Sequence, residues 1–175
     1  MKIISFQNDI LPLKNELYRL ALRITLDHAE AEDVVQETMI KVWNRREQWA
    51  KIESIEAYCL TICRNLALDK TRRMGRQDES LNEETHETAD HSYGSNPEEH
   101  AMQQDRIRLI RRLVDSLPEK QRTIMLLRET EGKSYKEIAE VMDITEEQVK
   151  VNLFRARQNL KQKYIEADRY GLSVH

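Results

Sequence analysis

Glycine and proline are scarce in this sequence: its 175 residues include only four glycines and three prolines. Both residue types interrupt helices and shape tight turns, so their scarcity disfavours a protein made of many short strands. Glu, Lys, Arg, Leu and Gln, which form helices well, are plentiful instead. The chain is 39% hydrophobic and 34% charged, which suffices for small cores but not for a deep one. We therefore predict an all-α protein.

Long apolar runs and cysteine clusters are missing as well. The stretch from Met1 to Asp9 has no small-residue cleavage pattern, and no segment approaches the length that spans a bilayer. We expect a cytoplasmic protein without direct membrane insertion. The two cysteines, Cys59 and Cys63, lie four residues apart on one predicted helix. No His or Cys cluster stands nearby to complete a metal site, so we interpret them as packed in a helix interface; whether they ever react stays open.

Acidic residues are concentrated in one segment. Residues 76–100 hold eight acidic residues and one arginine, a net charge of −7, which leaves +4 for the rest of a chain whose total is −3. The segment also lacks an apolar period, as a flexible linker does. Two mildly basic lobes joined by an acidic connector are compatible with DNA binding. We predict two small helical domains, 1–75 and 100–175, joined by a flexible acidic linker, 76–99.

Apolar residues recur at helical spacing in three stretches before this linker and in one after it. The expected helices are residues 9–25, a helix that follows Asp27 and His28, a helix from Ser54 to about Arg73, and residues 100–116. The residues that recur at helical spacing in the four stretches are Leu13, Leu17, Leu20, Ala21 and Ile24; Ala31, Val34, Val35, Thr38 and Val42; Ala57, Leu60, Thr61, Arg64 and Leu68; and Ile107, Ile110, Leu113, Val114 and Leu117.

The C-terminal part of the sequence has the pattern of a helix-turn-helix. Pro118 opens a helix that Gly132 ends, and Ser134 with Glu137 forms a capping box for the next one. A short turn then leads to Thr145, which can cap the last helix. The inward stripes of the two final helices are Tyr135, Ile138, Ala139 and Met142, and Val149, Leu153, Ala156 and Leu160. Two short helices joined by a tight turn indicate DNA binding.

Basic, amide and apolar side chains share the outward face of the last predicted helix. Early positions of a recognition helix reach base edges in the major groove, where Arg and Asn make bidentate contacts. An ordinary solvated helix is the alternative, but an exposed Phe beside Arg favours DNA contact. The residues that we expect to project away from the core are Lys150, Val151, Asn152, Phe154, Arg155, Arg157, Gln158 and Lys161.

Several stretches resemble the extracytoplasmic-function group of bacterial sigma factors. The segment from Asp27 to Trp43 resembles the helix with which these proteins bind core RNA polymerase, and Glu56–Arg73 is similar to their promoter-reading helix. Residues 116–122 and 135–139 resemble their second conserved domain. The chain shows neither the extra N-terminal region nor the intermediate domain of larger sigma factors, which places it in the small group. The resemblance implies that the protein binds core polymerase and promoter DNA, and that an anti-sigma factor regulates it.

The resemblance also implies roles for individual residues. It assigns polymerase binding to Asp33, Gln36 and Glu37, and contact with the promoter −10 element to Asn65, Asp69, Arg72 and Arg73. Of these, we expect Asp69 either to orient an arginine or to cap local structure, because an acid repels DNA. It assigns the −35 element to Lys150, Val151, Phe154 and Arg155, and we extend this set to Asn152 and Arg157 on the same predicted helix. Val151 and Asn152 depart from the usual pattern of the group, so the −35 sequence preference does not carry over.

Residues 48–53 correspond to the loop that captures a flipped base in these proteins. Trp49 is either a wall of that pocket or a buried aromatic at a hinge. A stand-alone helix-turn-helix regulator is the alternative function, although it leaves the Asp33–Glu37 surface unexplained. A metal hydrolase using His28, Glu32 and Asp33 is disfavoured because these residues are not spaced to converge on one metal. We predict no enzymatic activity, no small-molecule substrate and no cofactor.

Overall fold

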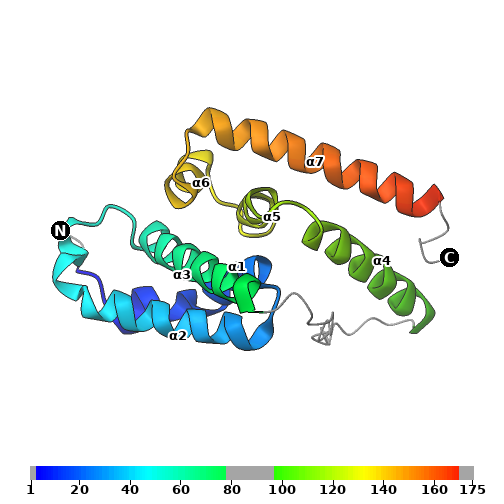
Figure 1. Cartoon of the computed structure of the whole chain (residues 1–175). Helices are drawn as coiled ribbons and strands as arrows, with labels where there is room; N and C mark the ends of the chain where they lie inside the picture. The colour runs from blue at the N-terminus through cyan, green and yellow to red at the C-terminus, as the bar shows by residue number, and fades with distance from the viewer. Residues whose placement is uncertain (1–2, 78–96, 170–175) are drawn as a thin grey trace.

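The computed structural model describes residues 3–77 and 97–169, and these residues form helices and connecting turns without a β-strand (Figure 1). The all-α prediction is confirmed. The α-helices are α1 (Lys14–Thr25), α2 (His28–Asn44), α3 (Ile55–Gln77), α4 (Pro97–Asp115), α5 (Glu119–Met125), α6 (Tyr135–Met142) and α7 (Glu146–Arg169). Short 3₁₀ or π segments extend or join them: η1 (Phe6–Ile10), η2 (Leu11–Leu13), η3 (Arg46–Lys51) and η4 (Leu126–Thr130). Most of the predicted linker lies outside the described residues.

Helices α1, α2 and α3 pack against one another and form what we call the N-terminal bundle. Helix α1 ends at Leu26, which adopts a left-handed conformation with φ 58°. The next residue, Asp27, caps α2, since its carboxylate accepts a hydrogen bond of 3.0 Å from the Glu30 N–H. All five residues of the inward stripe predicted for α2 are buried. The spacing of apolar residues therefore identified the core face of this bundle.

Helix α3 is longer than the sequence predicted. Its cap is as expected, because the Ser54 hydroxyl accepts a hydrogen bond of 3.2 Å from the Ala57 N–H. The helix then continues to Gln77, past Gly75, where the predicted domain ended. Apart from its chain neighbours and the adjacent backbone of its own helix, no atom lies within 4 Å of the position that a Cβ on Gly75 would occupy. One exposed glycine costs a helix only about 1 kcal/mol, which is too little to end one of this length.

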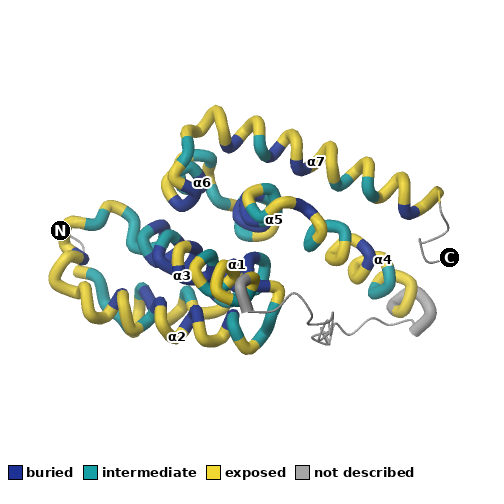
Figure 2. Tube along the Cα trace, viewed as in Figure 1, coloured by how far each residue is buried: buried dark blue, intermediate teal, exposed yellow. Residues whose placement is uncertain are grey.

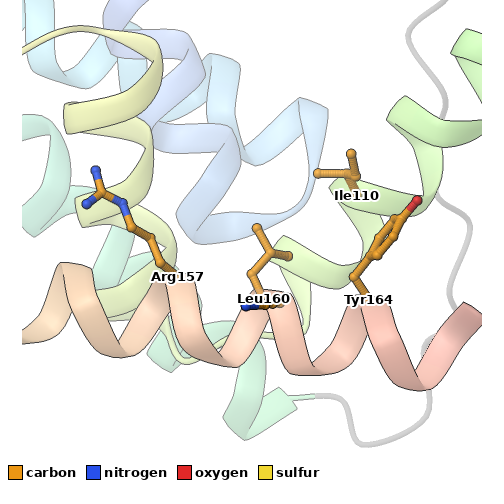
Figure 3. Close-up of a pocket in the computed structure, with 5 residues that line it drawn as sticks. Ile110, Arg157, Leu160 and Tyr164 are labelled. Carbon is orange, nitrogen blue, oxygen red and sulfur yellow. The ribbon is translucent and has the colours of Figure 1, made fainter.

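Helices α4 to α7 form the C-terminal bundle, in which α7 packs against α4, α5 and α6. The apolar residues predicted at helical spacing on α4 are only partly buried: Ile107 is 54% exposed and Ile110 is 42% exposed, whereas Leu109 is buried. Exposed stretches alternate with buried and intermediate ones along α4 (Figure 2). Ile110 lines a shallow pocket of about 290 Å³ with Leu160 and Tyr164 of α7 (Figure 3). Helical spacing identified an apolar face on α4, but no other described element buries it fully.

The two bundles lie directly against each other. Helix α6 packs on α3, and α5 packs on α1 (Figure 1). One continuous apolar cluster includes Leu17 and Leu60 of the N-terminal bundle together with Ile124 and Leu127 of the C-terminal bundle. In the described part of the chain, no helix combines the length and apolar character needed to cross a membrane.

Candidate functional site

The helix-turn-helix consists of α6, a short turn and α7. The Ser134 hydroxyl accepts a hydrogen bond of 3.1 Å from the Glu137 N–H at the start of α6, as predicted. Helix α6 ends at Asp143, which has a left-handed conformation with φ 55°. The Thr145 hydroxyl accepts a hydrogen bond of 3.1 Å from the Gln148 N–H, and the Gln148 side-chain oxygen accepts one of 2.9 Å from the Thr145 N–H. This reciprocal capping box fixes the start of α7; the sequence prediction did not include Gln148, although the T-x-x-Q spacing signals it.

The outer face of α7 presents an apolar and basic surface. Val149, Leu153 and Ala156 are buried on the inner side. On the outer side, Phe154 is 63% exposed and Val151 is 46% exposed. Arg155, which lies one turn from Val151, is also exposed. Phe154 and Val151 therefore form, with Arg155, an apolar and basic surface that the described elements leave exposed.

Of the remaining predicted −35 residues, Lys150 is exposed, whereas Asn152 and Arg157 have partners within the protein. Asn152 is half-buried, and its amide donates a hydrogen bond of 2.7 Å to the Gln148 carbonyl. Arg157 reaches back to Glu129, with 2.7 Å between its Nε and the carboxylate, and lines the pocket at α4. The Lys150 ammonium lies 5.5 Å from the Tyr135 ring centre. The expectation that these side chains project away from the core therefore needs correction for Asn152 and Arg157, because intramolecular partners take them to the sides of α7.

The predicted −10 residues all lie on the exposed part of α3. Asn65, Asp69, Arg72 and Arg73 are exposed. The Asp69 carboxylate lies 3.9 Å from the Arg72 guanidinium, which fits the expectation that this acid orients an arginine. Together Asp69, Arg72 and Arg73 give this part of α3 a net positive charge.

The predicted polymerase-binding residues lie on the exposed side of α2. Asp33 and Glu37 are half exposed, and Gln36 is exposed. Lys70 of α3 reaches across, with its ammonium 3.4 Å from the Glu37 carboxylate and 3.8 Å from that of Asp33. The pKa of Lys70 is raised: burial opposes the charged form, but Glu37 and Glu30 outweigh it. Lys70 was not among the predicted residues, because its partners lie on another helix and no local spacing connects them.

Trp49 is buried, and its indole N–H donates a hydrogen bond of 3.1 Å to the Val42 carbonyl. Its ring also packs edge-on against Trp43. The structure thus supports a buried hinge aromatic over a pocket wall. Because the Trp49 side chain packs against the end of α2, it does not form an open wall that could hold a flipped base.

Both cysteines are buried and free, as the packing interpretation requires. Burial raises the pKa of each thiol to about 12, so neither is ionised near neutral pH. His28 contacts the Tyr18 hydroxyl through its Nδ1. Within residues 3–77 and 97–169, no three His, Cys, Asp or Glu side chains converge as metal ligands would.

Both bundles are similar to known protein families. The family model of Sigma-70 region 2 matches residues 10–77, and that of Sigma-70 region 4 matches residues 107–160. The extracytoplasmic-function (ECF) RNA polymerase sigma-E factor of Escherichia coli is 30% identical over 140 residues, which covers 77% of this chain and 73% of that protein. The chain belongs to the ECF sigma factors. The sigma-E factor of Salmonella typhi matches with the same identity and coverage.

Two solved structures share the fold. The sigma factor RpoE of Bartonella quintana, in complex with the anti-sigma factor NepR, matches with a TM-score of 0.74 and 24% identity, covering 90% of this chain and 94% of its own. CnrH, in complex with the cytosolic domain of CnrY, matches with a TM-score of 0.63 and 19% identity, covering 93% and 88%. Family membership gives the function of the chain: it is a sigma factor, which binds core RNA polymerase and directs it to promoters.

Proposed function

We propose that this sigma factor divides its work among three faces. The outer face of α2, with Asp33, Gln36 and Glu37, binds core polymerase. The exposed part of α3, from Asn65 to Arg73, contacts the −10 element. The outer face of α7, with Val151, Phe154 and Arg155, contacts the −35 element. The observation that carries the proposal is that each face is exposed and chemically distinct, although the three lie on packed helices.

The α7 face has the chemistry of major-groove readout. The Arg155 guanidinium can donate two hydrogen bonds to a guanine edge, a contact worth about 1–3 kcal/mol of discrimination. Phe154 and Val151 offer apolar surface to thymine methyl groups. Arg157 and Asn152 have intramolecular partners, so in this proposal they support the helix rather than read bases.

The α3 face has the chemistry of phosphate and single-strand contact. Arg72 and Arg73 supply positive charge for phosphates, while Asn65 lies two turns earlier with an amide for a base edge or the sugar–phosphate backbone. On α2, the acids Asp33 and Glu37 offer carboxylates to a basic partner, so we assign this face to protein rather than to DNA.

Run-off transcription with bacterial core polymerase on genomic promoter fragments tests the proposal. We expect initiation that depends on this protein and is lost when Gln36 and Glu37 are both replaced by alanine. Arg155→Ala should abolish discrimination at one −35 base pair, so that changing this base pair no longer matters. Lys120→Ala, an exposed change outside all three faces, is the matched control. Tight operator binding without core polymerase, and no initiation with it, would indicate a stand-alone regulator instead.

The proposal extends to regulation and location. One solved neighbour is a complex with an anti-sigma factor and the other a complex with the cytosolic domain of CnrY, which supports an anti-sigma protein as a binding partner of this chain. A protein that acts on polymerase and the chromosome works in the cytoplasm. It directs the polymerase's chemistry and needs no catalytic group of its own.

A further inference from the structure

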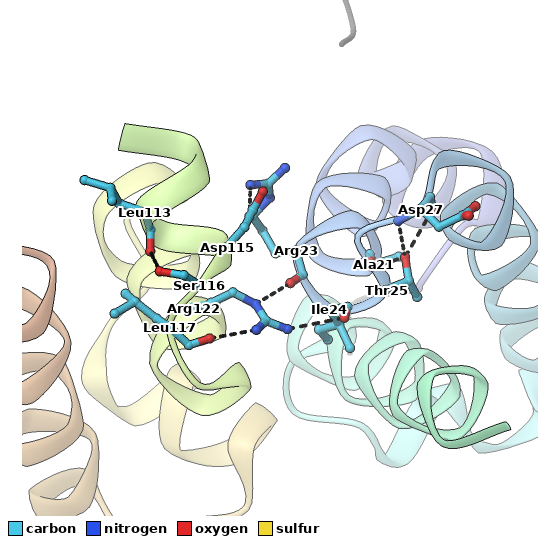
Figure 4. Close-up of polar contacts among 10 residues, drawn as sticks. All are labelled: Ala21, Arg23, Ile24, Thr25, Asp27, Leu113, Asp115, Ser116, Leu117 and Arg122. Atoms are coloured by element: carbon cyan, nitrogen blue, oxygen red, sulfur yellow. Dashed lines mark hydrogen bonds and ion pairs between the residues drawn. The ribbon is translucent and has the colours of Figure 1, made fainter. Parts of the chain in front are cut away.

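Several basic side chains of this protein have partners that hold their charge within the fold. Arg23 of α1 pairs with Asp115 of α4 at 2.7 Å, and Arg122 of α5 donates a hydrogen bond of 2.8 Å to the Arg23 carbonyl (Figure 4). On α7, the Arg157 guanidinium pairs with Glu129. Each of these arginines would have to break a contact within the protein before it could bind an anion.

Arg128 and Lys150 differ, because both lie against one aromatic ring. The Arg128 guanidinium carbon is 4.3 Å from the centre of the Tyr135 ring, and the Lys150 ammonium is 5.5 Å from it. Arg128 also donates a hydrogen bond of 2.8 Å to the Lys133 carbonyl, which uses one of its five N–H donors. Among the described residues, neither cation forms an ion pair with an acid. Two positive charges therefore share one ring without a carboxylate of the described chain to balance them.

The three side chains, which we call the Tyr135 clamp (Arg128, Tyr135 and Lys150), come from three different elements. Arg128 belongs to η4, Tyr135 is the first residue of α6, and Lys150 lies in the second turn of α7. The faces of an aromatic ring carry negative charge and attract cations. Tyr135 is half-buried and packs against the apolar core, so its ring has a fixed position. The ring can therefore orient two side chains that are longer and more flexible than its own.

The Tyr135 clamp has the chemistry of a phosphate site. Attraction to the ring offsets only part of the repulsion between two cations, whereas an anion bound between them would be attracted by both. An arginine presents a planar fork of N–H donors to a phosphate, and a lysine binds a phosphate as a point charge. Lys150 is exposed and Arg128 is half-buried, so solvent and a ligand can reach both.

The position of the Tyr135 clamp indicates a phosphate of DNA. In helix-turn-helix complexes the second helix lies in the major groove, while the first helix crosses the sugar–phosphate backbone. The Lys150 ammonium lies toward Tyr135, at the start of the first helix, and not toward the outer face that holds Val151 and Arg155. Lys150 is therefore directed to the backbone at the edge of the groove rather than to the base edges within it.

We propose that Arg128 and Lys150 bind the phosphate backbone beside the −35 element, and that Tyr135 is a positioning residue that holds both side chains for this contact. The inference rests on the proposed contact between α7 and the −35 element, and it changes the role of Lys150. A phosphate contact strengthens binding to any duplex and does not distinguish bases. Lys150 then contributes affinity, whereas Arg155 contributes the choice of sequence.

The salt dependence of DNA binding tests the clamp. The full-length protein in complex with core polymerase is bound to a promoter fragment, and to the same fragment with a scrambled −35 element, between about 50 and 200 mM salt. We expect Arg128→Met and Lys150→Met each to weaken both complexes about three- to tenfold. Each should also reduce the slope of log affinity against log salt by about 1, because it removes about one phosphate contact. Lys120→Met, which removes the same charge from an exposed site outside the clamp, should change neither quantity.

Variants of Tyr135 separate positioning from packing. Tyr135→Phe keeps the ring and should bind DNA about as tightly as wild type. Tyr135→Leu removes the ring, and we expect it to weaken binding about two- to fivefold and to make the salt dependence less steep. In a protein that already carries Arg128→Met and Lys150→Met, Tyr135→Leu should change the affinity less than about twofold, because no cation is left to position. Circular dichroism checks that each variant keeps its helix content.

Three results would overturn the proposal. One is an unchanged salt slope in both Arg128→Met and Lys150→Met. Another is a loss of affinity confined to the intact −35 element, which would mean that these side chains read bases. The third is an equal loss caused by Tyr135→Leu with and without the two cations, which would reduce Tyr135 to a packing role. If the wild type failed to distinguish the intact from the scrambled −35 element, the proposed −35 function would fail instead, and the salt slopes on either fragment would still decide whether the clamp binds phosphate.

Discussion

The two bundles use apolar residues in different ways. In the N-terminal bundle, the whole stripe predicted for α2 is buried between neighbouring helices. In the C-terminal bundle, Ile107 and Ile110 of α4 and Phe154 of α7 remain exposed. Helical spacing alone cannot separate these cases, because it shows which residues share a face and not whether another element covers that face. The N-terminal bundle also exposes apolar side chains, such as Ile40 at 60%, but on α2 they lie outside the predicted stripe, whereas on α4 they belong to the predicted set.

The largest expected effect is the difference in thiol reactivity between the folded and the unfolded chain. It reports on the N-terminal bundle alone, since both cysteines lie there. Burial raises the pKa of Cys59 and Cys63 from 9.0 to about 12. At pH 8 the thiolate fraction is then about a thousandfold lower in the folded than in the unfolded chain. We expect a disulfide reagent to label unfolded protein readily and native protein only through unfolding.

The same shift has a consequence for stability. The pKa of each thiol is higher in the folded chain than in the unfolded chain. The protonated thiols therefore contribute fully to the stability of the folded state below pH 9. The free energy of unfolding falls as pH rises from 9 toward 12, because the unfolded chain then loses these protons more readily. Replacing Cys63 by alanine should therefore flatten the alkaline part of the unfolding curve. Rapid labelling of the native wild type at pH 8 would show that the N-terminal bundle opens more easily than its packing indicates.

Core truncation compares the two bundles directly. Leu20 is fully buried in α1, whereas Ile110 on α4 is 42% exposed. Leu20→Ala should lower the free energy of unfolding by about 2–5 kcal/mol, because it removes buried methyl groups and leaves a cavity. Ile110→Ala should cost less than about 1 kcal/mol, since much of its surface already meets water. Urea unfolding followed by circular dichroism measures both, and equal losses would contradict the contrast between the bundles.

The sequence predicted the N-terminal bundle well, because its helices have signals at both ends and one covered face. Asp27 and Ser54 cap their helices as expected, and the buried stripes follow from spacing. The predicted end of the third helix, near Arg73, falls four residues short of Gln77, because the apolar spacing fades before the helix itself ends. On α4, spacing showed which residues share a face but not whether that face is covered, because burial depends on neighbours distant in the sequence.

The candidate site was predictable as far as it is local. The faces of α2, α3 and α7 follow from positions along one helix, and so their exposure could be anticipated. Lys70, Arg157 and the pairs across the bundles could not, since each depends on a residue of another element. Trp49 had two interpretations that only packing could decide, because the same aromatic suits a pocket wall and a core.

Trp49 and Trp43 offer a smaller contrast within the N-terminal bundle. Trp49→Phe removes the hydrogen bond to the Val42 carbonyl and part of a buried ring, and should cost about 1–2 kcal/mol. Trp43 is 47% exposed, so Trp43→Phe should cost well under about 1 kcal/mol. Thermal unfolding ranks the two variants. If Trp49→Phe left stability unchanged but impaired promoter melting, Trp49 would contact DNA after all.

The smallest effect concerns Lys70 of α3, which pairs with acids on the α2 face that we propose binds polymerase. Its ammonium holds the carboxylates of Asp33 and Glu37, which are half exposed, so the pairing is worth only a fraction of a kcal/mol. We expect Lys70→Met to weaken binding to core polymerase about two- to fourfold, and Lys70→Arg to restore it, because an arginine keeps the charge between the two acids. Affinity for core measured without DNA separates this effect from promoter contact. Tighter binding by Lys70→Met would mean that Lys70 competes with the polymerase for these carboxylates, and the lysine would then restrain the α2 face instead of preparing it.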